Sequence, residues 1–196
     1  MKDRRYSNRG QSLEQFLRYA NERYKNCGIA VICKIPTEIL PIRNAYGTVV
    51  NAKVCSKSTV DFIGRVQDRP IAIEAKHTMG DSIRWDAVQE HQAEFLKIYE
   101  QGGNGLSLVI VSFNLERFYT IPAMFWIAAR TAWKEAQNRG RKSAEKIEVT
   151  YNGQVWRTNG KASVKESELL PEWRVESGGR YGLDYLRAYR NSGTIG

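Results

Sequence analysis

Three residues of this chain have types and a spacing that could hold a metal ion beside a phosphate. Asp61 stands in one apolar segment, and Glu74 and Lys76 stand two residues apart in the next. Carboxylate oxygens suit Mg²⁺ or Mn²⁺, and water and phosphate oxygens complete the coordination of such ions. A bound ion of this kind polarises a phosphoryl oxygen and lowers the pKa of its bound water. We therefore predict that Asp61 and Glu74 hold a divalent cation, and that Lys76 stabilises the charge of the reacting phosphate or orients the attacking water.

The segments that carry these residues are predicted to be neighbouring antiparallel strands, over residues 60–66 and 71–76. With a two-residue turn at residues 67–68, Asp61 lies directly opposite Glu74, in the closer, non-hydrogen-bonded kind of pair. Like charges in that position repel each other and destabilise a sheet. The register therefore favours a cation between the two carboxylates.

The same residues also fit a simpler interpretation, a solvated surface hairpin in which Glu74 and Lys76 form an exposed ion pair. For an isolated pattern of this kind, that interpretation is the more common one. The residues that flank Glu74 are apolar, however, and apolar flanks are typical of an internal strand. These flanking residues are Ile71, Ala72, Ile73 and Ala75.

Hydrophobic periodicity predicts the elements that must position these residues. Apolar residues at helical spacing predict three helices, and runs of β-branched or apolar residues predict strands. The first helix begins after Ser12, which has the spacing of a capping box with Gln15, and Gly28 fits just beyond its end. The predicted helices span residues 13–26, 85–101 and 122–138, and the further strands span residues 29–35, 106–113 and 117–121. This order predicts an α/β fold, a mixed sheet with helices packed against it.

Residues 36–58 break this pattern. They contain two prolines, one glycine and several Thr and Asn residues, with only modest alternation of apolar and polar side chains. Proline and glycine weaken the interior of a strand or a helix, so this composition does not suit a core element. We predict an extended excursion here, such as a hairpin, that projects from the core.

The chain has 196 residues, with 30 Lys and Arg against 21 Asp and Glu, which gives a formal net charge of +9. This length suits a single domain over residues 1–196. A positive charge of this size indicates a polyanionic partner, with nucleic acid as the first candidate. Three scattered cysteines argue against a disulfide framework, and no apolar run is long enough to span a bilayer. The first residues are basic and lack the apolar core of a secretory signal, so we expect a cytoplasmic protein.

The positive charge is concentrated in residues 1–9 and 130–165. Two interpretations stay open for these segments: a solvated surface, or a surface that follows phosphates, which aromatic residues between the charges favour. These aromatic residues are Tyr6, Trp133, Tyr151 and Trp156. For Phe125 and Trp126, as for Trp133, a place in the core or on a dimer surface is the stronger expectation.

The pattern Asp61…Glu74-Ala75-Lys76 resembles the PD-(D/E)xK nuclease motif, from which the proline is often absent. The surrounding sequence resembles, more specifically, the RecU family of Holliday-junction resolvases, over roughly residues 9–130 and more weakly near the C-terminus. Residues 131–160 do not align with that family and look like a basic insertion. The matching stretches are Arg9-Gly10, Leu13-Glu14, residues 28–37, Ser58-Thr59-Val60-Asp61, residues 73–78, His91-Gln92 and residues 182–186.

The resemblance implies a restriction-endonuclease-like mixed β-sheet flanked by helices, in a homodimer that binds a four-way DNA junction. This enzyme would nick two strands symmetrically with Mg²⁺, in recombination and repair, with recombinase or branch-migration proteins as further partners. The resemblance assigns metal binding to Asp61 and Glu74, and catalysis to Lys76. It adds Glu14 as an active-site acid from the first helix and Gln92 as a residue that orients water or a ligand. Both of these also fit ordinary polar positions of a helix.

In this resemblance, residues 36–58 correspond to the family's stalk, which reaches into the centre of the junction. Three cations of this segment, Arg43, Lys53 and Lys57, would meet phosphates, and Arg9 is a further expected DNA contact. Their contacts would add the salt dependence that is typical of phosphate binding.

Two other functions stay open beside junction resolution. The first is a restriction-like or repair nuclease that acts on duplex or flap DNA. The second is a DNA-binding modulator of recombination without cleavage, which the intact set of acids and lysine disfavours. One departure from the family's pattern is Val60, where the family has Thr, so that a hydroxyl would come from Thr59 or be absent.

Overall fold

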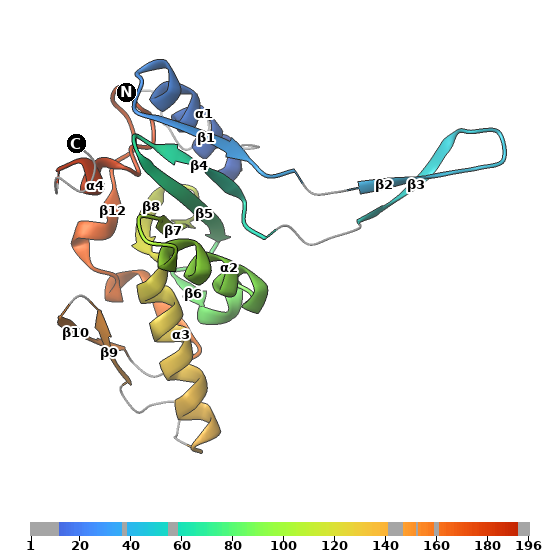
Figure 1. Cartoon of the computed structure of the whole chain (residues 1–196). Coiled ribbons are helices and arrows are strands. Elements are labelled where there is room, and N and C mark those ends of the chain that lie inside the picture. Colours follow the sequence, from blue (N-terminus) through green and yellow to red (C-terminus); the bar gives the residue numbers. More distant parts are fainter. Residues whose placement is uncertain are drawn as a thin grey trace.

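The computed structural model describes residues 12–36, 39–54, 59–140, 147–151, 153–158 and 161–191. Its centre is a six-stranded sheet with helices against it, from which a narrow hairpin projects (Figure 1). The pair of β5 and β7 is parallel and the other pairs are antiparallel, so the predicted mixed sheet flanked by helices is confirmed. The strand order is β1 (Ala30–Lys34), β4 (Phe62–Val66), β5 (Arg69–Thr78), β7 (Leu106–Phe113), β8 (Arg117–Pro122) and β12 (Arg174–Val175).

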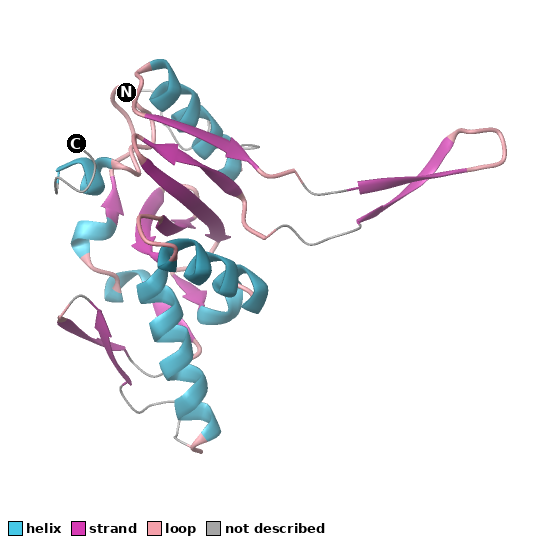
Figure 2. Cartoon of the chain, viewed as in Figure 1, coloured by secondary structure: helices cyan, strands magenta, loops and turns pink. Residues whose placement is uncertain are grey.

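Helices and three small strand pairs accompany the central sheet (Figure 2). The helices are α1 (Leu13–Asn26), α2 (Glu90–Gln101), α3 (Ala123–Asn138) and the short α4 (Arg187–Asn191). The strand pairs are β2 (Ile39–Arg43) with β3 (Val49–Val54), β6 (Ser82–Arg84) with β11 (Ser163–Lys165), and β9 (Ile147–Tyr151) with β10 (Gln154–Thr158). Short 3₁₀ turns are η2 (Trp85–Ala87), η3 (Glu166–Glu168) and η4 (Pro171–Trp173). Within the described ranges, no helix has the length and apolar character needed to cross a membrane.

Two apolar cores lie on the two faces of the sheet, and the side chains of β7 alternate between them. Leu108 and Ile110 belong to the core that includes α1, whereas Val109 and Val111 belong to the core that includes α2 and α3. Successive side chains of a strand point to opposite faces, so a strand covered on both sides must be apolar throughout. β7 is buried along its whole length, as its sequence predicted.

Helix α1 spans the predicted residues and begins at the predicted capping box. Ser12 Oγ accepts a hydrogen bond from the Gln15 N–H at 3.3 Å, and Gln15 Oε1 accepts one from the Ser12 N–H at 2.8 Å. Gly28 follows the helix with a φ of +69°, which glycine adopts without the steric cost of a Cβ atom. The start and the end of this helix are thus set by local sequence.

The prediction for the second helix is wrong about the residue at which the helix begins. Residues 85–101 have the spacing of one helical face, but α2 begins at Glu90 and η2 precedes it as a separate turn. Gln89 caps α2 through a capping box with Gln92, which fixes the first turn of the helix there. Trp85 shares the apolar pattern because it packs in the same core, although it lies outside the helix.

The hairpin of β4 and β5 has the predicted register around a turn at residues 67–68. The ladder ends at the pair of Phe62 with Ile73, one position before the predicted pair of Asp61 with Glu74. At that position the Asp61 N–H donates to the Ile73 carbonyl at 3.1 Å. The two acidic residues therefore lie at the end of the ladder, where the backbone departs from regular pairing.

The predicted excursion is the hairpin of β2 and β3, which reaches away from the sheet in Figure 1. Its pairing is antiparallel, with an irregularity between Ile42 and Arg43. The described side chains of this hairpin are exposed to solvent. Residues 37–38 and 55–58, and with them Lys57, lie outside the described residues.

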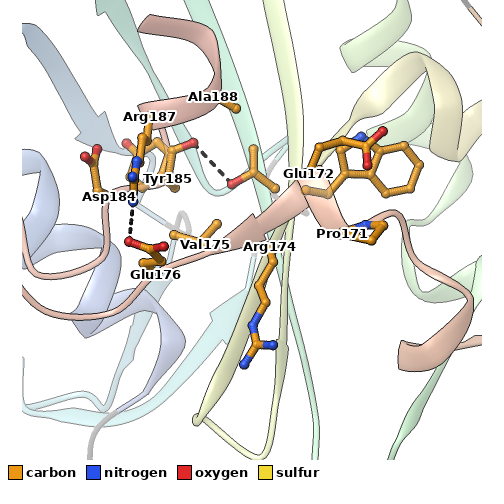
Figure 3. A pocket seen from close by; sticks show the side chains of 11 residues that line it. Pro171, Glu172, Arg174, Val175, Glu176, Asp184, Tyr185, Arg187 and Ala188 are labelled. Atoms are coloured by element: carbon orange, nitrogen blue, oxygen red, sulfur yellow. Dashed lines mark hydrogen bonds and ion pairs between the residues drawn. The ribbon is translucent and has the colours of Figure 1, made fainter. Parts of the chain in front are cut away.

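The C-terminal segment closes the core on the α1 face through hydrogen bonds of buried side chains. The Tyr24 hydroxyl of α1 donates to Asp184 at 2.8 Å and accepts from the Leu186 N–H at 3.2 Å. The Thr120 hydroxyl of β8 donates to the Tyr185 carbonyl at 3.2 Å (Figure 3). A cavity of about 480 Å³ lies between this segment and β12.

In the described part of the basic segment around α3 and β10, aromatic rings pack in the core and several cations are paired, which favours the solvated surface of the two open interpretations. Trp156 is buried in the core of α2 and α3, and Trp133 packs against the same core. Phe125 and Trp126 are buried there too, as expected. Described cations of the segment contact acids, in the pairs Arg130–Glu90, Lys134–Glu90, Arg139–Glu135 and Arg157–Glu148.

Candidate active site

Glu74 is a buried acid inside a small polar cluster on the α2 face of the sheet. It lies on β5 with only 1% of its surface exposed. Its Oε1 accepts a hydrogen bond from Gln92 Nε2 at 2.7 Å and lies 2.6 Å from Lys76 Nζ. Alternation along β5 places Glu74 and Lys76 on one face, and α2 brings Gln92 to them.

The side-chain amide of Gln92 is held in one orientation by its neighbours. Its Oε1 accepts from the Gln89 N–H at 3.0 Å and from Lys76 Nζ at 3.2 Å, while its Nε2 donates to Glu74. A flipped amide would direct its N–H groups at two donors and its oxygen at a carboxylate. The capping box of α2 therefore also sets the direction of the hydrogen bond to Glu74.

Asp61 reaches the same place from the start of β4. Its Oδ2 accepts a hydrogen bond from the Ala75 N–H at 2.8 Å, and Ala75 stands between Glu74 and Lys76 on β5. The Ile35 N–H, just beyond β1, donates to the Asp61 carbonyl at 2.8 Å. One neighbouring segment thus fixes the backbone of Asp61, and β5 fixes its carboxylate.

The electrostatics of the cluster show two acids crowded together with little water. Burial raises the pKa of Glu74, the charge of Asp61 raises it further, and Lys76 opposes the rise, so that the pKa reaches about 7. A carboxyl group with a pKa this high is held near a competing negative charge in a poorly solvated site. A divalent cation would neutralise the pair, and would so remove both the repulsion between the two acids and the cost of burying their charge.

The donor atoms of the cluster fit such a cation. Glu74 Oε2 is buried and has no hydrogen-bond partner, so a carboxylate oxygen remains to bind a ligand. Buried polar atoms are rarely left in this state unless an ion, water or ligand completes them. No group of three or more Asp, Glu, His or Cys side chains that could hold a metal occurs in the described ranges. Two carboxylates would thus leave the remaining coordination positions to other oxygens, as Mg²⁺ sites commonly do.

The structure shows Glu14 in contact with a basic residue of the sheet. Glu14 lies in the first turn of α1 and forms an ion pair with Lys34, the last residue of β1. Lys34 pairs with Phe62, the neighbour of Asp61, across the β1–β4 ladder. A catalytic role for Glu14 stays a prediction.

Two of the four residues that are expected to contact DNA lie on the projecting hairpin. Arg43 ends β2, and its Nη1 donates to the Gly47 carbonyl at 2.8 Å. Lys53 lies exposed on β3. Arg9 and Lys57 fall outside the described residues.

Sequence reasoning passed over two residues of the site's surroundings. Gln89 supports Gln92 through its N–H, and the sequence does not mark this position, because a capping box usually begins with a short polar residue such as Ser or Thr. Lys34 pairs with Glu14, and no local pattern predicts that contact because it joins a helix and a strand edge.

The cavity of Figure 3 is separate from this cluster. It lies against β8, β12 and α4, and its lining contains none of Asp61, Glu74, Lys76 or Gln92. Strand β7 stands between β8 and β5 in the sheet.

Comparison with known proteins decides the family. The model of the family described as RecU, recombination protein U, matches residues 8–172. The chain belongs to the RecU family. The match includes residues 131–160 and stops before residues 182–186, so it reaches further than the resemblance read from the sequence and leaves the closing segment outside. The predicted restriction-endonuclease-like fold class agrees with this RecU membership and with the mixed sheet.

Curated relatives of this RecU chain bear the name Holliday junction resolvase RecU. Three of them are each 34% identical over 162 residues, which are 79% of this chain and 79% of the relative. They come from Bacillus cereus (strain B4264), Bacillus mycoides (strain KBAB4) and Bacillus anthracis (strain CDC 684). Among solved structures, Archaeoglobus fulgidus Hjc, a Holliday junction resolvase from an archaeal hyperthermophile, matches with a TM-score of 0.38 and 13% identity. That match covers 57% of this chain and 78% of the other.

Proposed function

We propose that this chain is a structure-selective endodeoxyribonuclease that resolves four-way DNA junctions by metal-dependent hydrolysis, in homologous recombination and DNA repair. The observation that carries the proposal is the buried Glu74, whose Oε2 has no partner and whose neighbours are Asp61 and Lys76. Support for the substrate comes from membership of the RecU family and from relatives named as junction resolvases.

In this proposal Asp61 and Glu74 hold Mg²⁺, with Mn²⁺ as an alternative ion. When bound, the ion would polarise the scissile phosphate and acidify a water molecule. The Lys76 ammonium, 2.6 Å from Glu74, balances the negative charge that gathers on the phosphate. Gln92 positions Glu74 and Lys76, and Glu14 would supply a further acid from α1.

The proposed assembly is a homodimer, because a two-fold symmetric enzyme would match the symmetry of the two opposed strands that are cut in a junction. Each chain would form a single domain. Arg43 and Lys53 on the hairpin, together with Arg9 and Lys57, would contact phosphates. Recombinase or branch-migration proteins would be further partners. The net charge of +9 suits a polyanionic substrate.

The test is a panel of labelled four-way, flap and linear duplex substrates of matched sequence, each with Mg²⁺, with Mn²⁺ and with EDTA. We expect paired symmetric nicks in the four-way junction with metal and no nicks in EDTA. Equal rates on the linear duplex would instead indicate a restriction-like or repair nuclease. Junction binding without nicking in either metal would indicate a DNA-binding modulator.

A further inference from the structure

Tyr46 at the tip of the β2–β3 hairpin is the most exposed large apolar or aromatic side chain noted in the described part of the chain. Its relative exposure is 93%, and the next value is 75%, at Met79. An aromatic ring in water forgoes the burial that normally stabilises such a side chain. Packing within the described part of the chain does not account for a tyrosine at this position.

The turn that presents Tyr46 is well ordered by hydrogen bonds. Asn44 Oδ1 accepts from the Tyr46 N–H and from the Thr48 N–H, each at 3.0 Å. Across the turn, the Asn44 N–H donates to the Thr48 carbonyl at 3.0 Å, and the Arg43 guanidinium donates to the Gly47 carbonyl at 2.8 Å. Gly47 has a φ of +79°, which a side chain at this position would strain. These bonds fix the backbone that carries Tyr46, so that binding would have to order only the rotation of its side chain, which lowers the entropic cost of binding.

The hairpin that carries Tyr46 suits a partner that is both anionic and flat. Residues 39–54 contain two cations, Arg43 and Lys53, and no acid. Four further apolar side chains of the hairpin are about half exposed, at 45–60%. They are Leu40, Ile42, Val49 and Val50. Cations beside exposed aromatic and aliphatic groups are the combination with which proteins bind unstacked bases and their phosphates.

We propose that Tyr46 stacks on a nucleobase exposed at the branch point of a DNA junction, so that the hairpin recognises an opened base step. This inference rests on the proposed function, because a branched DNA supplies the exposed base. In a continuous duplex every base face is covered by its neighbours, and the ring has no partner. Tyr46 therefore contributes to preference for branched over linear DNA.

The experiment compares Tyr46→Ala, Tyr46→Phe and the wild type on a four-way junction and a linear duplex, in EDTA so that no strand is cut. Tyr19→Ala is the matched control, since Tyr19 is half exposed at 53% on α1. We expect Tyr46→Ala to weaken junction binding about five- to a hundredfold, the range measured for the loss of one base stack, with duplex binding unchanged. Tyr46→Phe and Tyr19→Ala should bind as the wild type does.

Photocrosslinking supplies a second measurement on the same proteins. A 5-iodouracil placed at the branch point should crosslink to Tyr46, as mapped by mass spectrometry, and the crosslink should disappear in Tyr46→Ala. Unchanged junction affinity of Tyr46→Ala, an equal loss on linear duplex, or an equal loss in Tyr46→Phe would each overturn the stacking role. The proposed function is tested separately, by metal-dependent nicking of the junction by the wild type. A positive result there would support the function even if the stacking inference fails.

Discussion

Two buried polar clusters, one on each face of the sheet, differ in how completely their atoms are paired. On the α1 face, the Tyr24 hydroxyl bonds to Asp184 and Leu186, and the Tyr185 hydroxyl bonds to Asn21. On the α2 face, Glu74 Oε1 has two partners and Oε2 has none. In the described ranges, Glu74 Oε2 is the only buried carboxylate oxygen left without a partner.

The difference indicates which cluster serves the fold and which serves a ligand. Pairing every buried polar atom stabilises one structure, and an unpaired carboxylate oxygen costs stability unless something binds it. The C-terminal cluster thus holds the chain together, while the Glu74 cluster is incomplete without a further group. Changes to the two clusters should separate stability from activity.

The largest expected effect is the loss of cleavage in Asp61→Asn and in Glu74→Gln. Each removes a proposed metal-binding charge, and metal stabilisation of the transition state is worth several kcal/mol, so cleavage should fall at least about a thousandfold. Single-turnover cleavage of a labelled junction measures this, with junction affinity largely retained. Asp68→Asn, an exposed acid of the β4–β5 turn, is the matched control and should cleave normally. Cleavage by Asp61→Asn within tenfold of the wild type would remove Asp61 from the metal site.

The next effect is a pH dependence of stability in metal-free protein. The pKa of Glu74 is raised from 4.5 to about 7, so its contribution to stability is present below pH 4.5 and is lost as the pH rises through 7. This shift corresponds to about 3 kcal/mol at pH 8. Urea unfolding in EDTA between pH 5 and pH 8 should show the loss in the wild type and a flatter profile in Glu74→Gln. Identical profiles would mean that Glu74 does not carry the buried charge.

Much of the scaffold could be predicted because its signals are local. The β4–β5 register follows from a two-residue turn and strict alternation, and α1 follows from the Ser12 capping box. The start of α2 was missed because Trp85 continues the apolar face and Gln89 is not a residue type that usually marks the start of a helix. The two-residue strand β12 depends on pairing with β8, and no local pattern specifies it.

The candidate site was predictable in part for the same reason. Asp61, Glu74 and Lys76 lie on paired strands whose period of two brings them together. The contact of Gln92 with both Glu74 and Lys76 depends on how α2 packs, which the sequence does not state. Tyr46 was not singled out because no local pattern marks it within residues 36–58, and only the structure shows how far its ring is exposed.

A smaller effect is expected from Gln92→Ala. Loss of a residue that supports a metal ligand usually costs about 10–100-fold in metal affinity or activity. We expect cleavage to need a correspondingly higher Mg²⁺ concentration, measured by titrating the ion at saturating junction. Gln101→Ala, at the exposed end of the same helix, should leave the titration unchanged. A drop in rate that no Mg²⁺ concentration restores would show that Gln92 does more than support Glu74.

The smallest effect on cleavage is expected from the fully paired cluster. Tyr24→Phe removes a hydroxyl that bonds to Asp184 and Leu186, which should lower the free energy of unfolding by about 1–3 kcal/mol. Cleavage per folded molecule should match the wild type at a temperature where both are folded. A loss of cleavage as large as that of Gln92→Ala would mean that the two faces are not independent.

The hairpin enters and leaves the sheet between the end of β1 and the start of β4. The described residues on either side of this insertion meet there, because the Ile35 N–H is bonded to the carbonyl of Asp61, a proposed metal ligand, at 2.8 Å. Removing or shortening the insertion would therefore change the chain directly beside Asp61.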